Sequence, residues 1–316
     1  MPGTWTWTEH QRTDSTDPDK KPYCDWLPTG CFTGHATQGC AGWANFSTQS
    51  CAELGNVFCD TDGNVVRLEL YESGLKCQLP DSLSQLTALT RLDLGNNRIV
   101  GTVPETLLTA LPHLSRMSIS RNEFTGSIPC ALSSSSLQFL SLSSNFLTGT
   151  LPTCLPQNLL ELEVAANLLT GTLPGSLGDL SNLVSLDVSS NQFTGNFPDS
   201  LSRLSRLAFL LASSTLMSGA LNQVVTTELP SLIKLDVSHS MWEGTLPPFS
   251  TTMQNLRVVQ VSVGQEESST SLVSLSLTGL SHPSLSVVDA SLGFSALVPQ
   301  RRHHESVAEK LWGGTG

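Results

Sequence analysis

Apolar residues recur along the chain in a fixed order, and within one short stretch of each repeat they alternate with polar residues. In LVSLDVSS, Leu186 and Val188 alternate with Ser185, Asp187 and Ser189. Alternation over so few residues predicts a short strand with one buried face. The pattern predicts parallel strands of a single sheet at 66–71, 90–95, 115–120, 138–143, 160–165, 184–189, 208–213 and 233–238.

A polar residue follows each predicted strand at a constant place. Five repeats carry an asparagine there, and three later repeats carry a shorter residue: Asn97, Asn122, Asn145, Asn167, Asn191, Thr215, Ser240 and Gly264. The intervals of 22 to 25 residues are typical of a solenoid, in which stacked coils share one core. We interpret the asparagines as structural, because an inward amide offers donors and an acceptor to the backbone of the turn.

The second half of each repeat carries a glycine followed by a proline. FTGNFP recurs as IVGTVP, FTGSIP, LTGTLP and WEGTLP. The glycine permits a turn with positive φ, and the proline suits the first position of a helical turn. Leucines in the segments that follow, such as DSLSR, are expected to pack back against the core.

Together the two halves read LxxLxLxxNxLTGxxPxxLxxLxx, which resembles the plant-type leucine-rich-repeat family over residues 65–250. The resemblance implies an α/β fold, a right-handed solenoid (horseshoe) with a parallel β-sheet on its concave face. It also implies a 3-10 or irregular convex side and a second small sheet at the TGxxP segment. Members of the family include receptor-kinase ectodomains, polygalacturonase-inhibiting proteins and protozoan surface antigens.

The resemblance also has implications for the two ends of the chain. Cys51 and Cys59 resemble the cysteines of the family's N-terminal cap, which implies a bridge between them, and Asp62-Gly63 predicts a hairpin turn into the first strand. After the repeats, LRVVQVSV, LVSLSLTG and LSVVDASL predict strands of shortened coils. We expect a disordered N-terminal segment, a cysteine-rich cap, the repeats, degenerate terminal repeats and a disordered tail at 1–22, 23–64, 65–250, 251–298 and 299–316.

Cysteine usage indicates an oxidising compartment. Six of the eight cysteines lie between Cys24 and Cys77, a density typical of disulfide-tied extracellular or cell-surface domains. The N-terminus carries no apolar signal segment, from which we expect an incomplete chain. A zinc site at Cys24, Cys31, His35 and Cys40 is the alternative, but its spacing fits no common closed site, so no metal is predicted. The pairing of Cys24, Cys31, Cys40 and Cys77 stays open.

Cys130 and Cys154 form a separate candidate disulfide. They are 24 residues apart, almost one repeat, and both follow the proline of a TGxxP segment. Adjacent coils lie roughly 4.8 Å apart, which brings equivalent positions within the Cα range of a disulfide. The alternative is a pair of buried free thiols.

Composition and motifs narrow the function classes. The net charge of -11 argues against nucleic acid and anionic membrane as partners, and no apolar run approaches the roughly 18 residues of a membrane span. No catalytic or cofactor motif is found, so we predict neither enzymatic activity nor a cofactor. Outward acidic residues could in principle pair for glycoside hydrolysis, but we interpret them as a solvated ladder: Glu69, Asp93, Glu163, Asp187, Asp236 and Asp289.

Binding is therefore the predicted function, with a protein or peptide ligand favoured over a glycan on the concave face. Arg67, Arg91 and Arg116 form a basic column, and Tyr71 is a further outward aromatic. The predicted ligand-binding residues depart from the small or acidic residues usual at outward positions: Phe139, Phe209, Leu211, Arg91, Arg116, Glu161, Lys234 and His239. The alternatives are a structural surface-coat or adhesion protein and a secreted inhibitor of a glycan-degrading enzyme.

Overall fold

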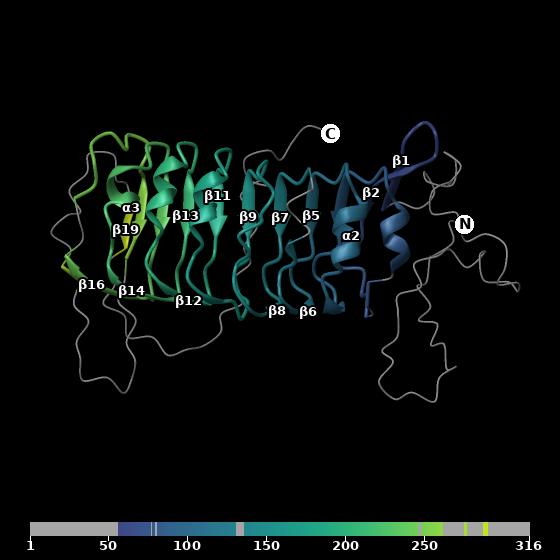
Figure 1. The fold of residues 1–316 in the computed structure, drawn as a ribbon, viewed down its shortest axis with the longest axis horizontal. Coiled ribbons are helices and arrows are strands. Elements are labelled where there is room, and N and C mark those ends of the chain that lie inside the picture. Colours follow the sequence, from purple (N-terminus) through teal and green to yellow (C-terminus); the bar gives the residue numbers. More distant parts are fainter. Residues whose placement is uncertain are drawn as a thin grey trace, which may run out of the picture.

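The computed structural model describes residues 56–76, 78–79, 81–130, 136–245, 248–261, 275–276 and 287–289. These residues form one elongated stack of coils, in which each coil contributes a strand to a long sheet (Figure 1). The described helices are all short, and none could cross a membrane. The described part is a leucine-rich-repeat solenoid, as the repeat pattern predicts.

In the part of the chain that the structure describes, the main sheet has eleven strands in the order β1-β2-β3-β5-β7-β9-β11-β13-β15-β17-β19. Their bounds are Val57–Cys59, Val65–Glu69, Arg91–Asp93, Arg116–Ser118, Phe139–Ser141, Glu161–Glu163, Ser185–Asp187, Phe209–Leu211, Lys234–Asp236, Val258–Gln260 and Val287–Asp289. All neighbours pair in parallel except β1 and β2, which form the antiparallel hairpin predicted at Asp62-Gly63. The eight predicted strands are confirmed, although most are three residues long because the turn begins earlier than the alternation suggests.

A second sheet forms where the chain turns away from the main sheet, along the lower edge of the view in Figure 1. It has a three-stranded part, β4-β6-β8, with bounds Val100–Thr102, Glu123–Gly126 and Phe146–Leu147. Its five-stranded part is β10-β12-β14-β16-β18, with bounds Thr170–Gly171, Gln192–Gly195, Leu216–Ala220, Met241–Thr245 and Leu275–Ser276. A bridge between Thr150 and Thr170 joins the two parts.

Among the described residues, each helical turn comes shortly before a strand of the main sheet. These turns are η3, α2, η5, η6 and α3, with bounds Asp81–Gln85, Glu105–Ala110, Gly175–Asp179, Asp199–Arg203 and Val224–Thr227. Three of them begin directly after a proline with an extended backbone, at Pro104, Pro174 and Pro198. The fixed φ of proline suits this place, as the TGxxP pattern predicts.

A single apolar core runs through the stack. The inward strand residues, such as Leu92, Leu162 and Leu186, have no exposed surface. One coil cannot bury these side chains alone, so the stability of each coil depends on its neighbours.

The asparagines lie buried in the turns, as the repeat frame requires, with 6 to 9% of their surface exposed. Asn167 is representative: its Nδ2 donates to the carbonyl oxygens of Leu142, Val164 and Ala165 at 3.0, 3.0 and 3.3 Å. Its Oδ1 accepts from the backbone N–H of Leu147 at 3.0 Å. Two of these partners lie in the preceding coil, so the side chain links adjacent coils.

Shorter side chains complete the ladder toward the C-terminus. The hydroxyls of Thr215 and Ser240 lie 3.0 Å apart, and both reach the carbonyl oxygen of Ala212, at 3.2 and 3.3 Å. Two hydroxyls in contact thus satisfy part of what one amide satisfies elsewhere. Gly264, predicted at the next place, lies outside the described residues.

The predicted disulfides have different outcomes. Cys130 and Cys154 are joined by a disulfide with Cα atoms 5.4 Å apart, as their spacing predicts. Cys59 is also disulfide-bonded, but Cys51, its predicted partner, lies outside the described residues. The same holds for Cys24, Cys31, Cys40 and Cys77, and for the expected disordered segments at 1–22 and 299–316.

One expectation about the terminal coils was wrong. LVSLSLTG was expected to supply the main-sheet strand of a shortened coil, but its strand β18 pairs with β16 in the second sheet. β17 pairs directly with β19, Val258 beside Val287, so the step between them is long rather than short. Alternation in sequence does not distinguish the two sheets, because both bury alternate side chains.

Candidate functional site

Most of the predicted binding residues share one row on the concave face of the main sheet. The strand register places the first outward residue of each coil beside its counterpart in the next. From N- to C-terminus the row is Arg67, Arg91, Arg116, Phe139, Glu161, Ser185, Phe209 and Lys234. Leu211 lies in the adjacent row, beside Asp187 and Asp236. His239 lies in the turn that follows β15.

At the basic end of the row, two of the three arginine side chains lie over aromatic rings. The Arg67 guanidinium lies 4.0 Å from the centroid of the Phe58 ring, and that of Arg116 lies 4.7 Å from the centroid of Phe139. Arg91 forms an ion pair with Glu69 at 3.2 Å. Ion pairing with neighbouring acids therefore accounts for Arg91, whereas Arg116 and Phe139 form a cation–π unit across two strands.

The two aromatic anchors do not form one cluster. Phe139 and Phe209 are both half-buried at the same place in their coils. Glu161 and Ser185 lie between them in the row, so β9 and β11 separate the two rings. Phe139 belongs with the arginines, while Phe209 lies beside Lys234.

Acidic side chains occupy the middle of the concave face. Glu161 and Asp187 are buried, and Glu163 is half-buried between them on β9. Burial raises the pKa of the Glu163 carboxyl to about 8, with further raising effects from Glu161 and Asp187, while a hydrogen bond with Ser141 lowers it. Burial and like charges held this close disfavour full ionisation of these carboxyl groups.

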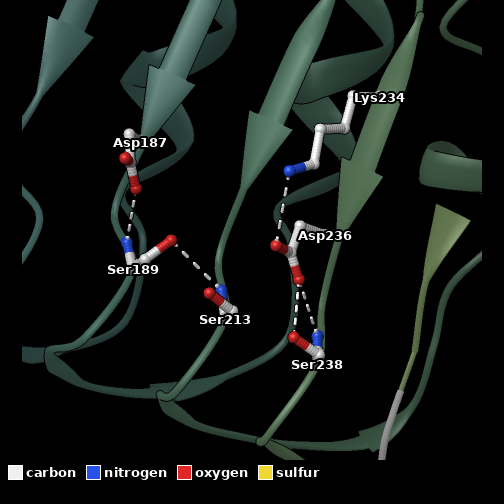
Figure 2. A network of polar contacts seen from close by, with 6 residues as sticks. All are labelled: Asp187, Ser189, Ser213, Lys234, Asp236 and Ser238. Atoms are coloured by element: carbon white, nitrogen blue, oxygen red, sulfur yellow. Dashed lines mark hydrogen bonds and ion pairs between the residues drawn. The ribbon is translucent and has the colours of Figure 1, made fainter. Parts of the chain in front are cut away.

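Several strand aspartates stabilise the turn that follows the strand. The interpretation of these residues as a solvated ladder did not include this role. Asp187 Oδ1 accepts from the backbone N–H of Ser189 at 3.0 Å, and the Ser189 hydroxyl accepts from the N–H of Ser213 at 3.3 Å (Figure 2). Asp236 binds Ser238 in the same way and lies 3.7 Å from the Lys234 ammonium. These carboxylates stabilise the turn after the strand, which explains why LDV is regular repeat sequence.

A depression of about 480 Å³ lies on the concave face, lined by residues from the coil of β2 to that of β13. It brings together Arg91, Arg116, Phe139 and Glu161 of the predicted site, with Tyr71 at its rim. The other predicted residues, Phe209, Leu211, Lys234 and His239, do not line it. The predicted site is thus divided into a hollowed half and a shallower half.

Sequence reasoning missed several residues that line this depression. They include small residues such as Ser118, Ser141 and Ala165, and Arg121 adds a cation beyond Arg116. Arg121 has a left-handed backbone with φ 55°, as do the residues before every asparagine, including Ser144 and Ala166. The signal was available, because the residue that precedes the asparagine lines the depression in four repeats: Arg121, Ser144, Ala166 and Ser190.

The second sheet presents a different surface, which we call the threonine face: Thr102, Thr125, Ser127, Thr148, Thr150, Thr170, Thr172 and Thr194. All eight residues are exposed. The hydroxyls of Thr125, Thr170 and Thr194 donate to a glycine carbonyl oxygen in the preceding coil, at 3.3, 3.2 and 3.4 Å. Those side chains are therefore held in one repeated orientation.

Glycine makes this regular packing possible. Gly126, Gly171 and Gly195 have positive φ, and an added Cβ would lie 2.9 to 3.1 Å from the threonine methyl group of the preceding coil. Glu123, the first residue of β6, is exposed on the same side of the strand as Thr125. The other segments of the face carry no charged residue: 100–102, 124–129, 146–152, 168–174, 192–198 and 216–221. Phe146, Leu168 and Leu216 are exposed within them by 52, 43 and 41%.

Comparison with known proteins agrees with the repeat geometry. Models of the leucine-rich-repeat family match residues 87–147 and 182–204. Receptor-like protein 18 of Arabidopsis thaliana is 33% identical over 60% of this chain. The chain spans only 23% of that protein and 13% of Protein STRUBBELIG-RECEPTOR FAMILY 3, which is 30% identical over 33% of this chain.

Two solved structures, of proteins with different ligands, have a similar fold. The leucine-rich-repeat ectodomain of the Arabidopsis receptor kinase HAESA, in complex with an IDA peptide hormone ligand, has a TM-score of 0.60 and 29% identity over 66% of this chain and 36% of that one. A plant ice-binding protein has a TM-score of 0.55 and 25% identity over 70% of this chain and 82% of that one. With the buried asparagines, the TGxxP turns and the parallel sheet, these matches support a plant-type leucine-rich-repeat family for this chain.

Proposed function

We propose that the chain is a non-enzymatic binding module of an extracellular or cell-surface protein, and that it takes a protein or peptide ligand on its concave face. One observation carries the proposal. The outward row changes from arginine to phenylalanine, glutamate, serine, phenylalanine and lysine within a few coils, while the inward rows stay leucine-rich. The scaffold does not require this variety, whereas a specific ligand does.

The chemistry of the depression favours a peptide over a bare glycan. Phe139 offers an apolar surface, and Arg116 and Glu161 on either side of it offer opposite charges. Extended peptides carry both kinds of group, and arginine and aromatic residues are common anchors at such interfaces. The peptide complex of the HAESA ectodomain supports the same class of ligand.

A displayed library of random linear peptides, selected on the purified chain, tests the proposal. We expect enriched peptides whose binding weakens when Phe139 and Phe209 are both replaced by alanine. Phe146→Ala is the matched control, because it removes an exposed phenylalanine from the second sheet. Absence of enrichment over an unrelated solenoid, or equal losses in the control, would contradict the proposal.

Ice binding is a second candidate function. The observation that favours it is the threonine face, an exposed, uncharged array in a chain whose net charge is -11. The likeness to the plant ice-binding protein, most of whose length is covered, supports the same candidate. Growth of an ice crystal in a solution of the purified chain tests it: shaped or arrested growth is expected, and growth as in buffer would rule the candidate out.

A further inference from the structure

We propose that the threonine face of the second sheet is the surface that binds ice. The inference rests on the second candidate function and adds the site and the groups that recognise the ligand. An ice surface is a periodic lattice of water without net charge. A protein surface that matches it must be regular, uncharged and rich in groups that hold water in fixed positions.

The threonine face meets the requirement for regularity. Neighbouring coils repeat at roughly 4.8 Å, and alternate residues along a strand at roughly 6.6 Å. Thr102 pairs with Thr125 and Thr150 with Thr170 across adjacent coils. In the following coil, Thr125, Thr170 and Thr194 lie beside Phe146, Gln192 and Leu216. Because Thr170 is fixed to the carbonyl oxygen of Gly149, its hydroxyl does not rotate freely, and the water bound to it takes a repeated position.

The face also provides both kinds of group needed at an ordered water surface. Threonine hydroxyls bind water, and the methyl groups, seated over Gly126, Gly171 and Gly195, limit the space between coils. The exposed side chains of Phe146 and Leu168 extend the apolar area beside the array. Apolar surface lowers the cost of releasing disordered water when a solid surface approaches.

Charge distinguishes this face from the concave face. Glu123 is the one charged residue in the described second-sheet strands from β4 to β14, whereas the depression is lined by Arg91, Arg116 and Glu161. Ionised groups orient their own hydration shells and oppose a neutral lattice. A neutral partner therefore complements the threonine face and does not complement the concave face.

Slow growth of polycrystalline ice from a solution of the purified chain tests the assignment, with the fraction of protein taken into the ice as the readout. The variant Thr148→Glu/Thr170→Glu places two charges on the threonine face. The matched control Ser120→Glu/Ser143→Glu places two charges in the depression. Thr148→Val/Thr170→Val keeps the shape and removes the hydroxyls, and thermal melts establish that each variant is folded.

We expect the threonine-face glutamate pair to reduce uptake at least about tenfold, a difference of about 1.4 kcal/mol, and the control pair to leave it unchanged. If both pairs enter ice like the parent chain, another surface binds ice, and the assignment fails while the second candidate function stands. If the parent chain is excluded from ice, that candidate function fails together with the assignment. Adsorption of the parent to microcrystalline cellulose, lost in the threonine-face pair, would then make the face a polysaccharide site.

Discussion

The concave face and the threonine face are built by the same coils, yet they differ in how much they vary from one coil to the next. On the concave face, Arg116, Phe139 and Glu161 occupy equivalent positions on three adjacent strands. On the threonine face, threonine lies beside threonine across adjacent coils, as in the pairs Thr102–Thr125 and Thr150–Thr170. Variety at fixed spacing is suited to one specific ligand, whereas uniformity at fixed spacing is suited to a periodic one.

Removing the buried hydrogen bonds of an asparagine in the turns, which support both faces, should have the largest effect on folding stability. Asn167→Leu leaves the backbone groups of Leu142, Val164 and Leu147 without their side-chain partner inside the stack. We expect a loss of about 3 kcal/mol in the free energy of unfolding, measured by urea denaturation. Gln192→Leu, which replaces an exposed amide, is the control, and equal stability of the two variants would contradict the structural role of Asn167.

The acidic centre gives a pH dependence that only the concave face should have. The folded-state pKa of Glu163, about 8, lies above its ordinary value of 4.5, so the native chain holds a proton that the unfolded chain releases between these limits. Stability should therefore fall as the pH rises from about 4.5 to about 8. Glu163→Gln should remove this loss.

Denaturation of the Glu163→Gln variant across the pH range measures the effect. We expect a gain over the parent of about 2 kcal/mol at the alkaline end, because each pKa unit corresponds to about 1.4 kcal/mol and solvent reduces the full value at a half-buried site. At the acid limit the two proteins should be equal. Glu228→Gln, at an exposed carboxyl group, should not alter the profile, and a parent profile that rises with pH would contradict the assignment.

A change at one glycine should disturb the threonine face and leave the concave face in place. Gly171→Ala forces a side chain onto φ 79° and toward the Thr150 methyl group at 2.9 Å. We expect a loss of about 1–2 kcal/mol in thermal unfolding. Gly175→Ala is the matched control, because its Cβ would meet the Ser200 hydroxyl at an ordinary 3.8 Å. Similar losses at both glycines would contradict this account of the turn.

The smallest effect expected is on ligand binding at the shallower half of the concave face. Phe209→Ala should weaken a selected peptide by more than about 1 kcal/mol, with little change in folding stability because the ring lies on the outward side. Titration by calorimetry measures it. Unchanged affinity in this variant, together with a loss in Phe139→Ala, would confine the site to the hollowed half.

Much of the fold could be predicted from sequence because a solenoid repeats the same local structure in every coil. The leucine spacing predicted the strands, the asparagines marked the turns, and the spacing of Cys130 and Cys154 predicted their disulfide. The assignment of LVSLSLTG to the main sheet was wrong, because alternation of side chains is common to both sheets and does not identify the neighbouring strand.

The candidate site was less predictable because it depends on contacts between coils. The repeat frame placed Arg116 and Phe139 on the same row, but their cation–π contact depends on side-chain direction across the strands. The depth of the depression likewise depends on which rows carry small residues, as Ser143 and Ser144 do. Pairwise packing of this kind is not encoded in the periodicity of one repeat.

Site-specific photocrosslinking tests the central claim most directly. Benzoylphenylalanine replaces Phe139 in one protein and Phe146 in another, so that similar aromatic probes stand on the concave face and on the second sheet. With a peptide selected on the parent chain, we predict crosslinking from position 139 and none above background from position 146. Crosslinking from position 146 alone would place the peptide on the second sheet and contradict binding on the concave face.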